Sequence, residues 1–136
     1  MPKSLTLRPL GIQSNGLADF SRRPERFDIA VFSKDNSSYN MKRIIGLPGE
    51  TVQIVNNYVY INGQLLEAEE SLRFAAIAGA AEYPVQLGKD EYFLLGDNRE
   101  SSEDSRFAGI GNIKDSQLIG KVWLKFQPLN ELGFIE

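Results

Sequence analysis

Two polar segments of this chain carry residue types that can do acid–base chemistry. In the first, Lys42 lies among the apolar residues Met41, Ile44 and Ile45, so part of its side chain should lie against the core. Because desolvation favours the neutral amine, such a lysine can have a lowered pKa, act as a general base and activate a serine hydroxyl. By itself, this segment is more typical of a strand lysine whose amine reaches water.

The second segment, residues 96–106, follows an apolar run at 92–95 and is dense in hydroxyl, carboxylate and guanidinium groups. Its two arginines and four acids could pair with one another and hold the loop rigid, as positioning a small hydroxyl requires. Its composition suits a solvated turn equally well. Taken together, however, the two segments are difficult to explain as ordinary surface.

The composition excludes several classes of function. With no His and no Cys, the chain cannot form a Ser-His-Asp triad, a cysteine nucleophile, a haem or iron–sulfur ligand set, or the usual structural zinc site. We therefore expect no metal and no cofactor. A net charge of −3 disfavours a nucleic-acid partner. The basic cluster Arg22, Arg23 and Arg26 is expected to be solvated surface.

The elements that must position the two segments are mostly strands. From residue 27 onward, short runs rich in Val, Ile, Tyr and Phe alternate with turn signals, which predicts an all-β fold of mainly antiparallel sheets with few short helices. The 136 residues suit a single domain, 1–136. Strands are predicted at 27–32, 39–45, 51–55, 58–61, 91–95 and 118–126, with turns at 46–49, 56–57 and 62–63. Only residues 67–81 have helical composition, and a loop suits them almost as well.

No segment of the sequence predicts a membrane span or a signal peptide. The longest run of small and apolar residues, 74–81, is far shorter than the roughly 20 residues that a spanning helix needs. No charged and then apolar segment precedes Ser4. The chain is therefore expected to be cytoplasmic or to have lost a segment.

In motif order and spacing, the chain resembles bacterial type I signal peptidase, the membrane-anchored serine protease that removes signal peptides from exported proteins. Residues 42–50 resemble the lysine box of this family, and Gly96-Asp97-Asn98-Arg99 with Ser102, Asp104, Ser105 and Arg106 resembles its downstream signature. The resemblance covers residues 24–128 and implies a β fold of the signal-peptidase type. The main alternative among proteases is the self-cleaving domain of SOS repressors, which uses a similar Ser-Lys dyad in a related β fold but lacks the Gly-Asp-Asn-Arg signature. Residues 65–87 would then be a short insertion between the two boxes.

The resemblance implies a role for each matching residue. Lys42 would be the general base of a Ser-Lys dyad, and Ser102 would orient it. Arg43 would pair with Asp97 as structural support, and Asp104 would pair with Arg106. Gly96 would leave room for the lysine side chain, and Met41 would line the site for a substrate with small residues before the cleavage point.

The nucleophile box of the family is not present intact, which leaves three alternatives. In the first, the chain begins inside the box, so that the serine lies just before Met1 and a membrane anchor is missing. In the second, Ser4 is itself the nucleophile. In the third, the chain is a noncatalytic relative that binds peptides and assists assembly of secreted or surface proteins. Retention of Lys42 favours the first two.

The function expected from this resemblance is a signal peptidase I-like serine endopeptidase. It would be inactive in this form if the box is truncated or degenerate. Its partners would be the signal peptides of exported preproteins, and no nucleic acid. It would lie at the cell membrane through the missing N-terminal anchor, with the catalytic domain on the extracytoplasmic side.

Overall fold

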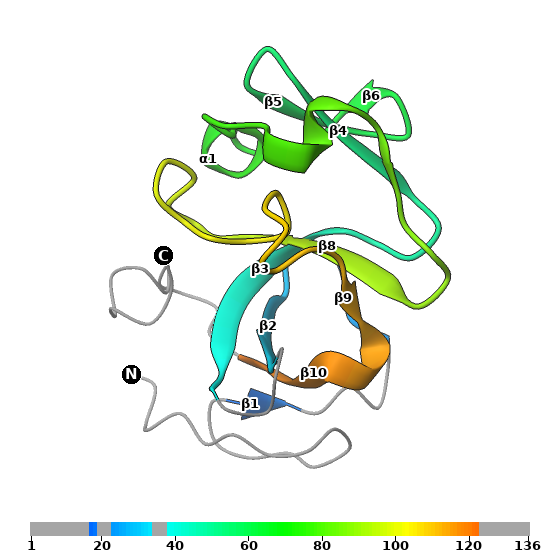
Figure 1. Cartoon of the computed structure of the whole chain (residues 1–136), viewed down its shortest axis with the longest axis vertical. Coiled ribbons are helices and arrows are strands. Elements are labelled where there is room, and N and C mark those ends of the chain that lie inside the picture. Colours follow the sequence, from blue (N-terminus) through cyan, green and yellow to red (C-terminus); the bar gives the residue numbers. More distant parts are fainter. Residues whose placement is uncertain (1–16, 19–22, 34–37, 123–136) are drawn as a thin grey trace.

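A computed structural model describes residues 17–18, 23–33 and 38–122 of the chain. Two antiparallel sheets form the framework of this part of the chain, which confirms the predicted fold class (Figure 1). The larger sheet has the order β1 (Leu17–Ala18), β10 (Leu118–Val122), β2 (Ile29–Phe32), β3 (Asn40–Gly46), β8 (Glu91–Leu95) and β9 (Ile113–Lys114). The smaller sheet has the order β6 (Gln64–Leu65), β5 (Tyr58–Ile61), β4 (Thr51–Val55) and β7 (Val85–Gln86).

The turns form where residues that tolerate a left-handed backbone occur in the sequence. Asn56 and Asn57 have φ values of 51° and 73°, and they join β4 to β5 in a tight hairpin. Asn62 and Gly63, with φ values of 52° and 83°, turn the chain again into β6. Two consecutive residues with positive φ match the right-handed twist of the flanking strands, and asparagine and glycine adopt this conformation most readily. The predicted strands 51–55 and 58–61 are confirmed with the expected bounds.

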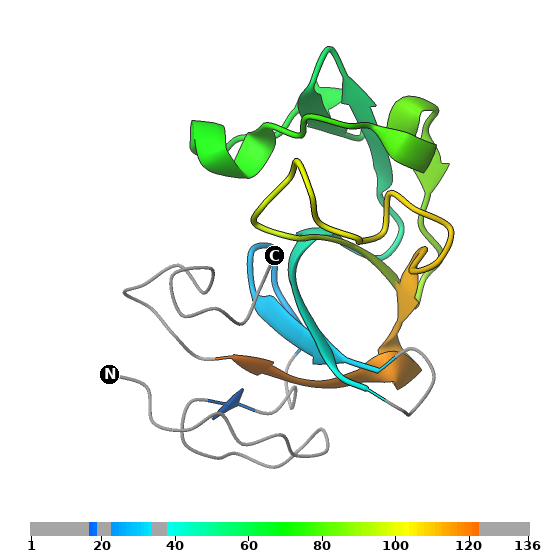
Figure 2. The ribbon, with the colours of Figure 1, turned by 60° about the vertical axis from the view of Figure 1, so that its left-hand side comes forward.

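Two hydrophobic cores share the same strands. Successive side chains of a strand point to opposite faces, and in β8 both faces are covered. Phe93 and Leu95 lie in a core with the smaller sheet, whereas Tyr92 and Leu94 lie in a second core with β2 and β9. This double burial explains why residues 92–95 form a continuous apolar run. Figure 2 shows the larger sheet curling round, with the loop that follows β8 lying between the two sheets.

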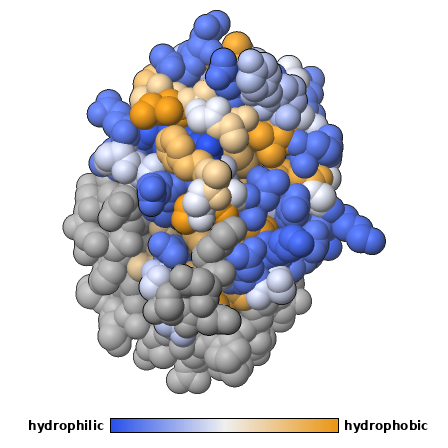
Figure 3. Space-filling model, in the orientation of Figure 1, coloured by the Kyte–Doolittle hydropathy of each residue, from blue (hydrophilic) through white to orange (hydrophobic). Residues whose placement is uncertain are grey.

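Within the described ranges, helical structure is limited to short turns. α1 covers Glu70–Arg73, and the 3₁₀ helices η1 and η2 cover Gly79–Glu82 and Asp115–Gln117. Residues 67–81 therefore contain one complete helix of four residues, and the helical composition of this stretch does not produce a longer one. Figure 3 shows apolar side chains among hydrophilic ones on the face around α1. In the part of the chain that the structure describes, no helix is long and apolar enough to cross a membrane.

Candidate active site

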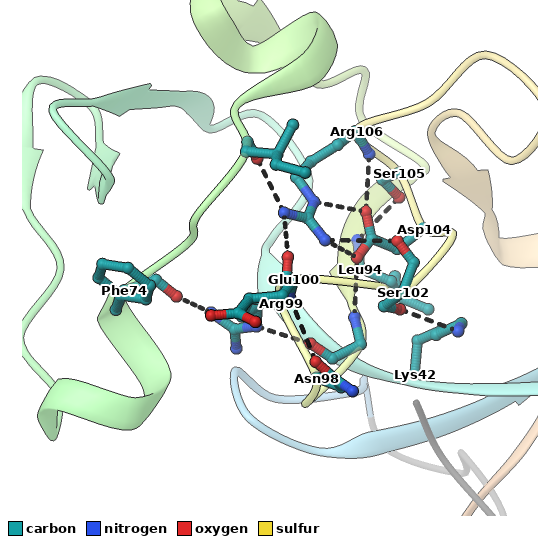
Figure 4. A network of polar contacts seen from close by, with 12 residues as sticks. Lys42, Phe74, Leu94, Asn98, Arg99, Glu100, Ser102, Asp104, Ser105 and Arg106 are labelled. Atoms are coloured by element: carbon teal, nitrogen blue, oxygen red, sulfur yellow. Dashed lines mark hydrogen bonds and ion pairs between the residues drawn. The ribbon is translucent and has the colours of Figure 1, made fainter.

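Lys42 and Ser102 meet in the interior of the protein although 60 residues separate them in the sequence. The Lys42 Nζ donates a hydrogen bond of 3.1 Å to the Ser102 Oγ (Figure 4). Lys42 is 6% exposed and Ser102 is 3% exposed. In the β2–β3 register, Lys42 lies opposite the small residue Ala30. Burial disfavours the charged ammonium, so this environment suits a lysine that acts as a base.

The loop at residues 96–106 is hydrogen-bonded back to β8, the strand that precedes it. The Leu94 N–H donates to the Ser105 Oγ at 2.9 Å, and the Ser105 N–H donates to the Leu94 carbonyl at 3.0 Å. Within the loop, the Ser102 N–H donates to the Asn98 carbonyl at 3.0 Å. These bonds place the hydroxyl of Ser102 relative to β8 and, through the β3–β8 pairing, relative to Lys42.

Asp104 and Arg106 form a completely buried ion pair inside this loop. The Asp104 Oδ1 accepts hydrogen bonds from the Arg106 backbone N–H and Nε, and the Asp104 Oδ2 accepts from the Arg106 Nη2 at 2.8 Å. The same Oδ2 accepts from the Gly96 N–H at 3.0 Å. The Arg106 Nη1 donates to the carbonyls of Arg99 and Ile77. The pair thus joins both ends of the loop to each other.

Arg43 and Asp97 form a second, bidentate pair beside the first. The Arg43 Nε and Nη2 each donate to one Asp97 oxygen at 2.8 Å, and Nη1 donates to the Phe27 carbonyl at 3.0 Å. Phe27 has a φ of 76°, a conformation that side chains other than glycine adopt only at a cost of about 1–3 kcal/mol. Its N–H donates to the Ile44 carbonyl, so both of its backbone groups are held by β3.

Arg26 departs from the solvated surface expected for its basic cluster. The Arg26 Nη1 and Nη2 donate to the two Glu50 carboxylate oxygens at 2.8 Å, and Nη1 also donates to the Ile45 carbonyl. The hydrogen bond from Glu50 raises the pKa of Arg26. Desolvation opposes ionisation of Glu50, but the hydrogen bonds from Arg26 and the Leu47 N–H outweigh it and lower the pKa of the carboxyl. The expectation is wrong for Arg26 because the partner acid lies 24 residues away, whereas Arg23 is exposed as expected and Arg22 lies outside the described residues.

The expected pairing of acids and arginines within the loop is correct for only one pair. Asp104 pairs with Arg106 inside the loop, whereas Asp97 pairs outside it with Arg43. Glu100 and Glu103 are exposed and form no ion pair with a described residue. The loop is also held by hydrogen bonds from the guanidinium groups of Arg99 and Arg106 to backbone carbonyls, which composition did not indicate.

The other predicted site residues are placed as follows. Met41 is half-buried on β3 next to Lys42, and the buried Gly96 contributes its backbone N–H and carbonyl to the loop. Ser4 lies outside the described residues. Sequence reasoning assigned no role to Arg99 or Ser105, although both belong to the motif, because their partners are backbone groups. Among the described residues, no group of three or more acidic side chains could hold a metal ion.

The fold and this site define a class of protein: an all-β domain that buries a lysine amine against a serine hydroxyl. Comparisons with known proteins identify the family. Residues 11–127 match the family model of signal peptidase, peptidase S26. The chain belongs to this family.

Individual relatives show the same relationship. The chain is 36% identical over 122 residues to a probable signal peptidase I-2 of Synechocystis, covering 84% of this chain and 53% of the relative. It is 37% identical over 123 residues to a signal peptidase I of Bacillus amyloliquefaciens, covering 85% of this chain and 63% of the relative. The chain thus spans little more than half the length of these relatives.

A solved structure supports the fold. The crystal structure of a signal peptidase I from Enterococcus faecalis aligns with a TM-score of 0.60 at 31% sequence identity. The alignment covers 75% of this chain and 98% of that one. The similarity therefore includes most of the two-sheet architecture and confirms the signal-peptidase fold.

Proposed function

We propose that this chain carries the catalytic site of a serine endopeptidase that removes signal peptides from exported proteins, with Lys42 as its general base. The observation that supports this most directly is the 3.1 Å hydrogen bond between the Lys42 Nζ and the Ser102 Oγ. A hydroxyl at this distance fixes the direction of the amine, which is the role of the third group in a nucleophile–base pair. The names of the relatives favour cleavage over a noncatalytic role.

The proposed reaction needs only side chains and water. Neutral Lys42 takes the proton of the nucleophilic serine as the serine oxygen attacks the carbonyl carbon of the scissile peptide bond. The resulting tetrahedral oxyanion collapses, the C–N bond breaks, and the lysine returns the proton to the leaving amine. The lysine then deprotonates a water molecule. This water attacks the acyl-enzyme and releases the serine. The nucleophile is Ser4 or a serine encoded before Met1.

The substrate would bind as an extended strand beside β3. β2 pairs with residues 40–43, whereas pairing with β8 begins only at Arg43. On the β8 side, an extended peptide would pair with Asn40 and Met41, for which no pairing with a described strand is found. Met41 on this stretch would contact the small side chains before the cleavage point. In this arrangement, the scissile bond would lie beside Lys42.

The proposed partners and location follow from this substrate. Signal peptides of exported preproteins reach the far side of the membrane, so the catalytic domain would lie on the extracytoplasmic side of the cell membrane. An N-terminal anchor would hold it there. A fusion of the natural coding sequence to a reporter active on only one side of the membrane tests this location.

Substitution of Lys42 tests the general base. Lys42→Ala should abolish cleavage of a peptide that has small residues before the cleavage site, because the proposed reaction then lacks the base that takes the proton of the nucleophilic serine. The measurement uses the protein translated from its natural start, with thermal unfolding followed in parallel. Lys89→Ala, which replaces an exposed lysine in the turn before β8, is the matched control and should cleave normally. Cleavage by a folded Lys42→Ala protein would disprove the assignment.

The nucleophile is found by a separate experiment. Reading the coding sequence upstream of Met1 in frame shows whether a hydrophobic segment and a serine precede it. Loss of cleavage in Ser4→Ala, with that upstream region unrelated, would identify Ser4. A protein that binds the peptide without hydrolysing it, whichever serine is present, would instead support the noncatalytic alternative.

A further inference from the structure

Arg99 is a buried cation without an acidic partner. It is 4% exposed, and none of the ion pairs among the described residues includes it. Its guanidinium is surrounded by backbone carbonyls instead. Nε donates to the Gly96 carbonyl at 2.6 Å, and Nη1 donates to the carbonyls of Leu72 and Phe74 at 2.9 and 2.8 Å. Nη2 is buried and has no hydrogen-bond partner among the described residues.

Such a group is costly for the folded state. Moving a charge out of water without an opposite charge destabilises a protein, and an unsatisfied buried N–H adds to this cost. Desolvation, which outweighs the favourable field of Asp97, lowers the pKa of Arg99 to about 10. An apolar side chain of similar volume would fill the same space at a lower cost. Stability alone therefore does not explain an arginine at this position.

The carbonyls that Arg99 binds are themselves held by the smaller sheet. Phe74 forms an isolated β-bridge with Tyr58, and their rings make an edge-to-face contact at 5.8 Å between centroids. The next residue, Ala75, donates its N–H to the Asn57 carbonyl at 2.8 Å. The end of α1 is thus fixed to the β4–β5 hairpin and gives Arg99 an immobile set of acceptors.

At its other end, Arg99 lies inside the turn that carries Ser102. Its Nε closes the turn by binding the Gly96 carbonyl, and the neighbouring Asn98 carbonyl accepts from the Ser102 N–H. Its own carbonyl accepts from the Arg106 Nη1 at 2.9 Å. Figure 4 shows Arg99 between the Phe74 carbonyl and the loop, with Ser102 and Lys42 on the far side of the loop. The side chain therefore connects the smaller sheet to the backbone that places the Ser102 hydroxyl.

We propose that Arg99 is a positioning residue for the reaction, which holds the Ser102 Oγ against the Lys42 Nζ by tying the 96–102 turn to the carbonyls of Leu72 and Phe74. This inference rests on the proposed function, because the dyad needs a directed lysine. It assigns the smaller sheet and α1 a part in catalysis, although neither contributes a group to the reaction. The proposal depends on the planar guanidinium with its several donors, because Nη1 donates to the carbonyls of Leu72 and Phe74 while Nε donates to the Gly96 carbonyl.

Two substitutions of Arg99 separate the effect of the guanidinium shape from the effect of its charge. Arg99→Lys retains the cation and most of the volume, and Arg99→Gln removes the charge. Arg73→Gln is the matched control, because Arg73 lies at the end of α1 beside the carbonyls that Arg99 binds, and it pairs with Glu70 and lies over the Tyr58 ring. We expect both Arg99 variants to lower kcat on the order of 10²-fold with KM unchanged. The control should match the unaltered protein.

Amide hydrogen exchange gives a readout that does not depend on activity. In the Arg99 variants, the Ser102 N–H should exchange at least roughly tenfold faster, whereas the Ile44 N–H, bonded to the Asp28 carbonyl within the sheet region, should keep its protection. Equal loss of protection at Ile44 would show a purely structural role and overturn the proposal. Unchanged exchange at Ser102, or an equal change in Arg73→Gln, would also overturn it.

The two proposals fail in different ways. If the unaltered protein does not cleave peptide but the Ser102 exchange responds to Arg99→Lys, the proposed function is wrong and the positioning of Ser102 by Arg99 stands. If the protein cleaves peptide and Arg99→Lys leaves both kcat and exchange unchanged, the proposed function stands and this inference is wrong. A normal kcat in Arg99→Lys with a reduced kcat in Arg99→Gln would show that only the charge matters, and would also overturn it.

Discussion

Asp104 is fully buried, and so is the side chain of its partner Arg106. A charge in this position is tolerated because each carboxylate oxygen accepts at least two hydrogen bonds, from Arg106 and from the Gly96 N–H. Two further cations, Arg43 and Arg99, lie half-buried or buried nearby, and the Lys42 amine is buried beside them. Hydrogen bonds therefore compensate the buried charges of this site. Single substitutions that remove one of these groups should have large effects on stability.

Removal of the Asp104 charge should be strongly destabilising. Asp104→Asn leaves the buried Arg106 without a carboxylate, and such a loss costs about 3–5 kcal/mol of unfolding free energy. Urea unfolding of the purified protein measures it. Asp97→Asn is the comparison, because its pair with Arg43 is 12% and 18% exposed and water can replace part of the lost interaction. Equal losses in the two variants would contradict the role assigned to burial.

At the scale of elements, the segment between α1 and β7 packs directly on the loop that carries Ser102. The Ala80 N–H donates to the Arg106 carbonyl at 2.7 Å, and the Arg106 Nη1 donates to the Ile77 carbonyl at 2.8 Å. Gly79 lies between these contacts with a φ of 57°. A Cβ added there would collide with the Arg106 carbonyl oxygen and lie 2.9 Å from the Arg106 Cβ. The close approach of the two elements therefore requires glycine.

Gly79→Ala should separate these two elements. Gly63→Ala is the control, since Gly63 also has a positive φ, 83°, but nothing lies within 4 Å of an added Cβ. The control should lose only the backbone term of about 1–2 kcal/mol. Gly79→Ala should lose clearly more, and should also speed the exchange of the Ala80 N–H. Thermal unfolding midpoints of the two variants compare them directly, and similar midpoints would mean that the contact is not tight.

At the scale of the whole molecule, the connection between the two sheets is held by Arg26 and Glu50. Glu50 ends the turn that leaves β3 and precedes β4, and Arg26 precedes β2, so their ion pair spans the junction. The Glu50 carboxylate also caps the turn by accepting from the Leu47 N–H at 2.8 Å. An ionised carboxylate therefore supports the junction between the sheets, beside the core that they share.

Stability should depend on pH through this carboxylate. Because the folded state lowers the pKa of Glu50 below its ordinary value of 4.5, the stabilisation is present above that value and is lost as the pH falls through the lower folded-state value. Glu50→Gln should lose about 1–2 kcal/mol of unfolding free energy at neutral pH. The difference from the unaltered protein should shrink as urea titrations are repeated toward pH 3. The exposed Glu67→Gln is the control and should show no such convergence.

Local features of the fold were predictable from the sequence. Strands 51–55 and 58–61 follow from the asparagines that flank them, since a left-handed turn and an alternating apolar pattern both act over a few residues. The apolar run at 92–95 predicted a strand, although not that its two faces would belong to two different cores. The predicted strand at 118–126 is described as far as Val122, and its remainder lies outside the described residues.

Long-range contacts were decided only by the tertiary structure. The sequence by itself determined which residue types were available: a lysine among apolar neighbours, a loop rich in hydroxyls and charges, and no histidine or cysteine. It also placed the matching motifs in their order. That Lys42 meets Ser102, that Arg26 pairs with Glu50, and that Arg99 binds carbonyls instead of acids depends on sheet register and on which groups lose water. Backbone carbonyls occur at every residue, so no sequence pattern distinguishes those that a buried guanidinium will find.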